Sequence, residues 1–479
     1  MRGLIFLFLF FLSQLVIAQE PFLSFDHNVN TLGKKPTQLF SAVFPENDTF
    51  LIFIEDSKQL SVYQFDENGK ETAEGFSFPN FAKKYPNIGG YIQENGTYTL
   101  FLSSTNKKKW AIVTLDFTYK SFNLQEAKLD IKGDRILESL TYNGKHYLFT
   151  VQRDTSTFEV YVMDSEGTIT TQTFSFEDVD FGGGRRTIPN LDRLLQGSFS
   201  REVAIIDSES PIALESSKSN VKFYQEEALV TLTIDSSKNT TFYLQFDLEN
   251  NTSSTQTISK ASFDKDIISA RSNSFIFEDK LFTLKVSSDE MDFSIYNLDS
   301  MENLASFSAR KGTPITFKNT PIIQEGGQLD SYRELEKTSK FLRKVATSNP
   351  AITVFKENDH YIITLGATQE ISNGGPGFFV VGGGLAGALV SGVITGIANA
   401  TYYQYNAYTY TKSARFQMVL DRDLQFVPDA EIPLNVFDEI GEFTQETSPK
   451  VIQTVFKLKD SYIWGALNAK TNTLNFFTF

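Results

Sequence analysis

One short pattern returns along almost the whole chain. A short apolar run ends in an aspartate, and a polar turn follows. The aspartates that end these runs are Asp66, Asp116, Asp164, Asp247, Asp299 and Asp421. Three of the intervals between neighbouring members are close to 50 residues. A fixed period of this size means that the chain is assembled from copies of one supersecondary unit.

The unit around Asp66 shows what is repeated. Phe50–Ile54 is a continuous apolar run, as expected for a strand that is buried on both faces. Leu60–Phe65 is its partner strand, Asp66–Gly69 contains an Asn-Gly turn signal, and Lys70–Phe78 supplies an outer polar strand. Small sheets repeated at a period of about 50 residues are typical of the blades of a β-propeller.

Strand pairs of this kind recur seven times along the chain. In the sixth, Tyr361–Leu365 finds its partner, Phe416–Leu420, only after a long insertion. We therefore predict an all-β protein, a β-propeller of about seven blades (six to eight), with one helical and one Gly-rich apolar insertion. Residues 19–479 would form a single domain, with insertions at 177–220, 311–349 and 372–412.

The last strand pair has no outer strand after it, because the chain ends at Phe479. The segment Phe22–Phe25 resembles the outer-strand endings Phe76–Phe78 and Phe174–Phe176, which both read Phe-Ser-Phe. An open sheet edge is a template for aggregation, so a ring needs closure. We predict that the N-terminal strand completes the last blade.

Residues 1–18 have the pattern of a secretory signal peptide. Arg2 precedes the apolar core Leu4–Leu12, and Ala18 is a small residue that suits cleavage after it. An uncleaved membrane anchor is the alternative, but the apolar run is shorter than the ~20 residues that a spanning helix needs. We expect export and cleavage after Ala18.

Cysteine is absent from the sequence, which excludes a lipoprotein anchor, disulfides and thiolate metal sites. Secreted eukaryotic domains often carry disulfides, so an exported chain of this size without cysteine favours a bacterial source. We expect the periplasm or the cell surface of a Gram-negative bacterium. The net charge of −14 argues against nucleic acid or an anionic membrane as the main partner.

The repeated aspartates could in principle bind calcium, since hard cations take carboxylate oxygens. We expect them to stabilise hairpin turns instead, because an Asp at a turn bonds the backbone two residues on. His27, His146 and His360 lie in different repeats and lack the close spacing of metal ligands. We therefore expect neither a metal nor a cofactor.

The first insertion holds a run of glycines followed by two arginines. The candidate anion-binding residues are Gly182, Gly183, Gly184, Arg185 and Arg186. Consecutive glycines can turn backbone N–H groups toward an anion, and paired arginines can clamp a phosphate, sulfate or carboxylate. The alternative is a structural loop in which the acidic run Glu177–Asp180 compensates the arginines.

The second insertion, 311–349, predicts an amphipathic helix over Tyr332–Val345. Ser331 would be its N-cap and Glu334 the partner in a capping box, and Asn349-Pro350 would end it. Packing against the ring is the default expectation for such a helix. A lid or a partner-binding surface are the alternatives.

The third insertion contains Gly374–Ala400, which carries no charge over 27 positions. Its candidate contact residues are the small-xxx-small pairs Gly383/Gly387 and Gly392/Gly396 and the tyrosines Tyr402, Tyr403 and Tyr405. A membrane span is opposed by topology, because a single crossing would separate two strands of one blade. A structural loop, self-association or partner contact, and peripheral membrane contact remain open.

No catalytic signature is present: there is no Gly-x-Ser-x-Gly nucleophile elbow, and no pair of carboxylates stands out. The primary hypothesis is an exported binding or scaffold protein of the bacterial cell envelope that binds a protein or glycan. The rival is a carbohydrate-active hydrolase or lyase that uses carboxylates on propeller loops. Carboxylates about 5–9 Å apart in the central depression would favour the rival, and a filled centre would favour binding.

Overall fold

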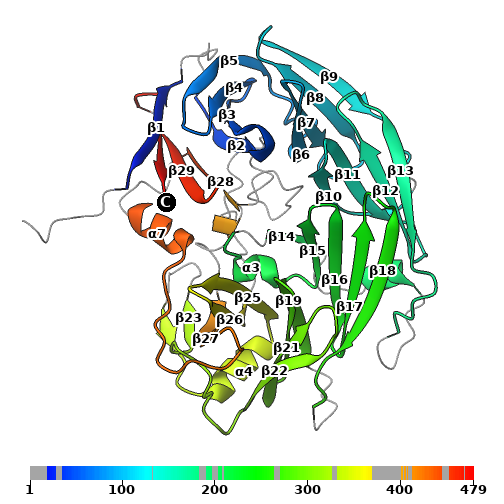
Figure 1. The fold of residues 1–479 in the computed structure, drawn as a ribbon, viewed down its shortest axis with the longest axis vertical. Helices are drawn as coiled ribbons and strands as arrows, with labels where there is room; N and C mark the ends of the chain where they lie inside the picture. The colour runs from blue at the N-terminus through cyan, green and yellow to red at the C-terminus, as the bar shows by residue number, and fades with distance from the viewer. Residues whose placement is uncertain are drawn as a thin grey trace, which may run out of the picture.

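Seven small sheets surround one axis in the computed structural model, and the protein is an all-β propeller of seven blades (Figure 1). The prediction of about seven blades is confirmed. The structure describes residues 19–27, 35–131, 133–182, 190–196, 203–207, 210–263, 270–325, 332–368, 401–402, 404–405, 407, 413–444, 452–468 and 470–479. The predicted signal peptide and the uncharged run Gly374–Ala400 lie outside these residues.

The first three blades are four-stranded antiparallel meanders that follow the chain from the axis outward. Blade 1 is β2 (Gln38–Phe44), β3 (Thr49–Glu55), β4 (Gln59–Asp66) and β5 (Glu71–Pro79). Blade 2 is β6 (Asn87–Glu94), β7 (Thr97–Ser103), β8 (Trp110–Asp116) and β9 (Ser121–Ala127). Blade 3 is β10 (Arg135–Tyr142), β11 (Lys145–Val151), β12 (Thr157–Met163) and β13 (Ile169–Ser175).

Blades 4 and 5 keep the same meander, and blade 4 gains a parallel fifth strand on its axial edge. Blade 4 is β14 (Val203–Ile206), β15 (Val221–Glu226), β16 (Leu229–Ser237), β17 (Thr240–Asp247) and β18 (Thr252–Ser259). Blade 5 is β19 (Arg271–Phe277), β20 (Lys280–Val286), β21 (Glu290–Asn297) and β22 (Asn303–Arg310).

Blades 6 and 7 depart from the simple meander, because each takes its outer edge from an earlier part of the chain. Blade 6 is β25 (Asn349–Glu357), β26 (His360–Thr368), β27 (Ser413–Leu420), β23 (Ile323–Glu325) and β24 (Arg333–Glu334). Blade 7 is β28 (Ile452–Leu458), β29 (Ser461–Asn468), β30 (Thr473–Thr478) and β1 (Pro21–Asp26). Four short helices and one 3-10 turn are described outside the blades: η1 (Pro45–Asn47), α2 (Leu191–Gln196), α3 (Leu214–Ser217), α4 (Thr338–Ala346) and α7 (Val436–Thr444).

The split pair of blade 6 has the predicted partners. Tyr361 lies opposite Leu420 and Leu365 opposite Phe416 in the β26–β27 ladder, although the long third insertion separates the two strands in sequence. In blade 7, Leu23 lies opposite Phe476 and Phe25 opposite Leu474. The N-terminal and C-terminal strands therefore share one sheet, which closes the ring between blades 7 and 1 (Figure 1).

Burial falls from the middle of each blade toward its outer edge. In β3 every residue after Thr49 is buried, whereas in β9 no residue is fully buried. Aromatic rings fill the gaps between neighbouring blades, as in the contact of Phe50 with Phe456, whose ring centroids lie 5.3 Å apart. Such ring pairs bury large apolar areas between sheets and explain why this chain uses so many phenylalanines.

The repeated aspartates act as predicted, by accepting hydrogen bonds from the backbone of their own turns. Asp66 Oδ1 accepts from Asn68 N at 3.0 Å, and Asp164 Oδ1 accepts from Glu166 N at 3.0 Å. In blade 5 the position is shifted: Asn297 Oδ1 accepts from the N–H of Asp299 at 3.0 Å, so Asn297 has the role expected of Asp299.

The prediction of a helix over Tyr332–Val345 is wrong about where the helix begins. α4 begins at Thr338, and Arg333–Glu334 instead form the outermost strand of blade 6. Lys337, the N-cap, is extended and makes no side-chain cap bond, so the expected capping box is not what begins the helix. Phe341, Leu342 and Val345 are fully buried, and α4 contacts the strands of blade 6. The helix therefore packs into the ring.

Each blade also has a strand nearer the axis than the sequence pattern indicated. These first strands of each meander are β2, β6, β10, β15, β19, β25 and β28, and in blade 4 the parallel strand β14 lies inside β15. Several carry small or polar residues, such as Gly89 and Gly90 in β6 and Ser272, Asn273 and Ser274 in β19. Such sequences lack the apolar run that marks the middle strands. Hydrophobic periodicity alone therefore does not detect them.

Candidate functional site

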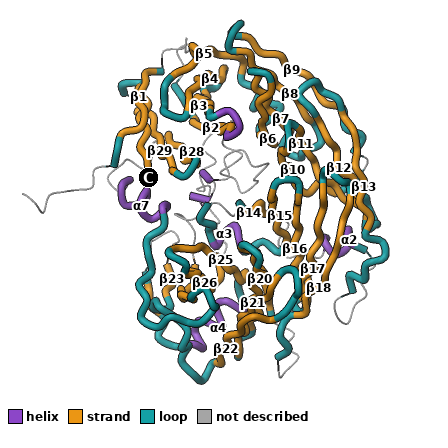
Figure 2. The backbone as a smooth tube through the Cα atoms, in the orientation of Figure 1, coloured by secondary structure: helices purple, strands orange, loops and turns teal. Residues whose placement is uncertain are grey.

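The centre of the ring contains segments of the protein's own insertions. β14 and α3, both from the first insertion, lie inside the ring (Figure 1). α3 contacts β14, β25 and β26. The tube drawing in Figure 2 shows the same two elements surrounded by the innermost strands. We call the described residues 203–207 and 210–219 the axial segment.

A residue that follows the Gly-rich run in the third insertion is hydrogen-bonded to the axial segment. The side-chain oxygen of Gln404 accepts hydrogen bonds from Ala213 N at 3.0 Å and from Ser216 Oγ at 2.8 Å. Gln404 is 1% exposed. Ser217 Oγ hydrogen-bonds the backbone of Ile352 on β25, the innermost strand of blade 6. The first and third insertions are thus hydrogen-bonded to each other and to the blade wall at the centre of the ring.

The described residues on either side of the Gly-rich run are buried. Thr368, which ends β26, is fully buried, and Thr401 is 8% exposed. Tyr405 is 3% exposed, contacts the ring of Phe437 on α7 and shares a hydrogen bond of 3.3 Å with Thr444. Tyr405 therefore makes an internal contact in this chain, while Tyr402 is half-buried against the same cluster.

The other residues predicted to make contacts are not described. Gly383, Gly387, Gly392, Gly396 and Tyr403 lie outside the described residues. No helix among the described residues is long and apolar enough to cross a membrane. The predicted contact surface therefore remains a prediction.

Of the predicted anion site, only Gly182 is described. It is exposed, and its N–H donates to Asp180 Oδ1 at 2.7 Å. The first amide of the expected cradle is therefore already bound to a carboxylate of the same loop. Gly183, Gly184, Arg185 and Arg186 lie outside the described residues.

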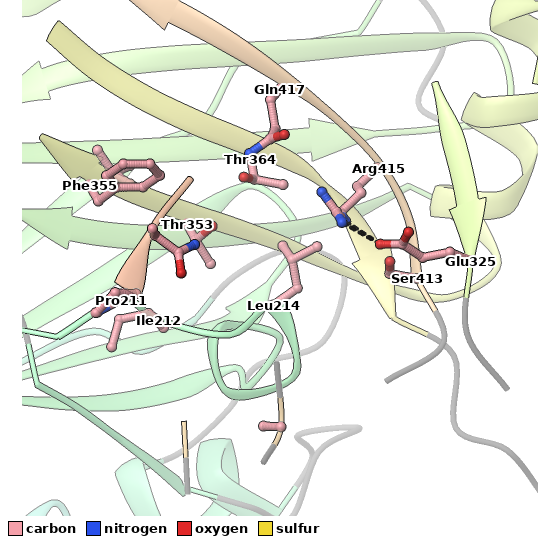
Figure 3. A pocket seen from close by; sticks show the side chains of 13 residues that line it. Pro211, Ile212, Leu214, Glu325, Thr353, Phe355, Thr364, Ser413, Arg415 and Gln417 are labelled. Atoms are coloured by element: carbon pink, nitrogen blue, oxygen red, sulfur yellow. Dashed lines mark hydrogen bonds and ion pairs between the residues drawn. The ribbon is translucent and has the colours of Figure 1, made fainter. Parts of the chain in front are cut away.

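A small cavity of about 60 Å³ lies between the axial segment and blade 6 (Figure 3). Its wall combines apolar residues of the axial segment, such as Ile212 and Leu214, with polar side chains of blade 6, such as Thr364. Arg415 on β27 forms an ion pair with Glu325 on β23 at one side of this cavity. Glu325 is the single carboxylate among the described residues that line it.

His146, on β11, is buried between blades 2 and 3. Its ring stacks on Phe101 with centroids 4.7 Å apart and lies 5.0 Å from the ring of Trp110. Neither ring nitrogen has a hydrogen-bond partner among the described residues. Burial, and to a smaller extent the charge of Lys107, lowers the pKa of His146 to about 3. The imidazole is therefore neutral at physiological pH.

A second ionisable cluster lies between the inner strands of blades 4 and 5. Asp235 on β16 forms ion pairs with Lys260 at 2.6 Å and with Lys222 at 3.6 Å, and all three side chains are almost completely buried. Burial lowers the pKa of Lys222 to about 8 and also lowers the pKa of Lys260. Burial alone would raise the pKa of Asp235, but the two lysines hold it at about 2.

Sequence patterns did not reveal this cluster. Its members lie on separate strands, and a charged residue in a sequence is normally expected at the surface. Among the described residues, no group of three or more histidines, aspartates and glutamates is placed to hold a metal ion. The cluster of two cations and one anion is also not a metal site by charge, since metals need anionic or neutral ligands.

Comparison with known proteins identifies no family. No family model matches the chain, and no curated protein matches it. The solved Dos1 propeller matches with 10% identity and a TM-score of 0.32, covering 97% of this chain and 95% of its own. A member of the DUF4221 family from Bacteroides vulgatus matches with 13% identity and a TM-score of 0.32, covering 90% and 98%. The propeller domain of the trilobed protease from Pyrococcus furiosus matches with 9% identity and a TM-score of 0.27, covering 83% and 81%. The assignment of seven blades rests on the sheets of this chain.

Proposed function

We propose that this protein is an exported, non-enzymatic β-propeller of the Gram-negative cell envelope. It binds a protein or glycan through the Gly-rich run of its third insertion. The observation that carries the proposal is the pair of hydrogen bonds from Ala213 and Ser216 to Gln404. They hold the chain after the Gly-rich run inside the ring, so a contact made by that run is anchored to the rigid scaffold.

The attachment points support this reading. The run begins after the buried residue Thr368 and ends before the nearly buried residue Thr401. A binding element that is fixed at both ends loses less conformational freedom when it engages a partner than a free tail would lose. The run itself is uncharged and rich in apolar residues, and a surface of that composition is normally covered by something.

The described residues at the centre of the ring do not favour the alternative function, a carbohydrate-active hydrolase or lyase. Hydrolysis of a glycosidic bond normally needs two carboxylates around one site. The cavity beside the axial segment has one carboxylate among its described lining residues, and Arg415 already pairs with that group, Glu325. Export and envelope location are supported by the pattern of residues 1–18 alone.

Site-specific photo-cross-linking tests the contact. A photoreactive phenylalanine analogue replaces Phe379 in the Gly-rich run. In the control protein it replaces Tyr119, which is 79% exposed in the turn between β8 and β9 of blade 2. Both proteins are expressed in the native host and irradiated in intact cells. The proposal expects an adduct with an envelope protein or glycan from position 379 and none from position 119. No adduct at position 379, or the same adduct from both positions, would contradict it.

Export has its own test. The native cells are fractionated, and the protein recovered from the envelope is sequenced from its N-terminus. The proposal expects Gln19 as the first residue. Protein that stays in the cytoplasm with Met1 or Arg2 at its N-terminus would show that residues 1–18 are not a signal peptide.

A further inference from the structure

Three buried groups meet between the inner strands of blades 4 and 5. The amine Nζ of Lys222, on β15, donates to the amide oxygen Oδ1 of Asn273, on β19, at 2.9 Å. Both residues are 0% exposed. Asp235 Oδ2, on β16, lies 3.6 Å from the same amine. An amine, a carboxamide and a carboxylate are therefore held together without access to solvent.

Neighbouring groups fix the orientation of the amide. Asn273 Nδ2 donates to the carbonyl oxygens of Lys218 at 3.2 Å and Ser219 at 3.5 Å. The amide oxygen therefore faces Lys222, and the amide nitrogen faces two acceptors. This orientation presents the carboxamide to the amine and leaves the leaving nitrogen among hydrogen-bond acceptors.

The carboxylate is equally constrained. Asp235 Oδ2 accepts hydrogen bonds from Ser274 N at 2.9 Å and Ser274 Oγ at 2.7 Å. Its other oxygen, Oδ1, accepts from Thr241 Oγ1 at 2.8 Å and pairs with Lys260 at 2.6 Å. Asp235 Oδ2 is therefore held in a fixed position 3.6 Å from the Lys222 amine, which is close enough for an ion pair but beyond hydrogen-bond distance.

The charges in this cluster do not balance. Lys222 and Lys260 together carry two positive charges when protonated, and among the described residues Asp235 is the one carboxylate that pairs with them. An excess buried charge is costly. Burial and the neighbouring Lys260 also lower the pKa of Lys222 to about 8, with Asp235 acting in the opposite direction, so a fraction of this amine is neutral near physiological pH.

We propose that Lys222 and Asn273 form an intramolecular isopeptide bond. This inference is independent of the proposed function. The neutral form of the Lys222 amine attacks Cγ of Asn273 through Nζ. The Nζ–Cγ bond forms, and the Cγ–Nδ2 bond breaks as Nδ2 takes one proton from the former amine. Ammonia leaves, and the new secondary amide keeps the other proton of the former amine.

The reaction needs no oxidant, reductant or cofactor. One amine and one carboxamide become one secondary amide and one ammonia, so atoms and charge balance. The product leaves Lys260 and Asp235 as a neutral pair, which removes the excess positive charge from the interior. Holding the reacting groups together in a site without water supplies the proximity that an isolated amine and amide lack.

The bond would join two blades that otherwise meet only through non-covalent contacts. Lys222 lies on β15 of blade 4 and Asn273 on β19 of blade 5, 51 residues apart in the chain. The departure of Nδ2 would remove its hydrogen bonds to the carbonyl oxygens of Lys218 and Ser219 at the end of the axial segment. A covalent link of this kind restricts the unfolded chain and thereby raises the melting temperature.

Mass spectrometry tests the proposal on the full mature chain. The N-terminus is first read directly, and the intact mass is then compared with the mass of that sequence. The proposal expects a mass lower by one ammonia and a proteolytic peptide in which Lys222 is joined to Asn273. A mass equal to that of the sequence after prolonged incubation of the folded protein would overturn it. Deamidation of Asn273 without a link would overturn it as well.

Variants test the two reacting groups. Lys222→Met should keep the full mass, and Asn273→Asp should form the same bond with loss of one water instead of one ammonia. If a variant does not fold, the peptide map of the wild-type protein still decides. The internal control is the pair Lys285 and Asn239. Lys285 Nζ donates to Asn239 Oδ1 at the same distance of 2.9 Å, but this site is only partly buried, so the two side chains should stay unlinked.

Discussion

Acid should destabilise this protein through His146, and the size of the effect follows from its burial. The pKa of this residue is about 3 in the folded protein and 6.5 in an unfolded chain. Above pH 6.5 the imidazole is neutral in both states. As the pH falls below 6.5, the unfolded chain takes up a proton that the folded protein does not accept until about pH 3. Stability is therefore lost on acidification.

The magnitude can be worked out at pH 4. The unfolded-state pKa lies 2.5 units above this pH, and one unit corresponds to ~1.4 kcal/mol, so His146 alone should remove about 3.4 kcal/mol from the free energy of unfolding. This is a large share of the stability of an ordinary domain. The cause is structural, because a charged imidazole would sit between Phe101 and Trp110, and the part of the chain that the structure describes offers no hydrogen-bond acceptor for either N–H.

The assay is urea unfolding at pH 7.5 and at pH 4 for the wild-type protein and for His146→Leu. The other titrating groups are common to both proteins, so the difference between their two acid losses isolates His146. Between pH 7.5 and pH 4, we expect the free energy of unfolding of the variant to fall by about 3 kcal/mol less than that of the wild type. An equal loss in His146→Leu and wild type would refute the reasoning.

Other predictions follow from the blades and loops. Deleting residues 19–28 removes β1 and should lower the free energy of unfolding by at least about 3 kcal/mol, because three half-buried apolar side chains are lost; unchanged urea unfolding would refute ring closure. Gly465→Ala places a Cβ 2.2 Å from the ring of Phe476 and should cost about 1–3 kcal/mol, which thermal melting would show as a lower Tm. If Arg185 and Arg186 bind an anion, sulfate should raise the Tm of the wild type but not of the double alanine variant, whereas equal gains would leave a structural loop.

Much of the ring could be read from the sequence because its middle strands are buried on both faces. A continuous apolar run such as Phe50–Ile54 marks a strand wherever it occurs, and the aspartate turns mark its ends. The same signal related Tyr361 to Leu420 across the long insertion, since the two strands keep their patterns when separated. The similarity of Phe22–Phe25 to other outer strands indicated the neighbour of the last strand.

The innermost strands could not be recognised in the same way. They face the axis, and β19 begins Arg-Ser-Asn-Ser, a sequence with neither an apolar run nor a clean alternation. The start of α4 was misplaced for a related reason. The apolar spacing that includes Tyr332 is compatible with a helix, but the chain there completes the edge of blade 6, and tertiary pairing overrides local propensity.

The buried clusters were beyond the reach of the sequence. Lys222, Asp235 and Asn273 come together only because three strands of two blades bring them there. His146 occupies the second position of its strand in blade 3, as Tyr361 does in blade 6, and its burial depends on packing against neighbours such as Phe101 and Trp110. Burial of polar groups is a property of the assembled ring.

We propose that the Gly-rich run is a contact element and not part of the core of the ring. Replacing residues 377–398 with a short Gly/Ser linker tests it, because a change of loop length costs little closure entropy. The measurement is the fraction of protein retained by native envelope membranes after washing, with the melting temperature as a check on folding. We predict a folded, monomeric variant with an unchanged melting temperature and most of its retention lost. A variant that folds and is retained like the wild type, or one that fails to fold, would contradict the claim.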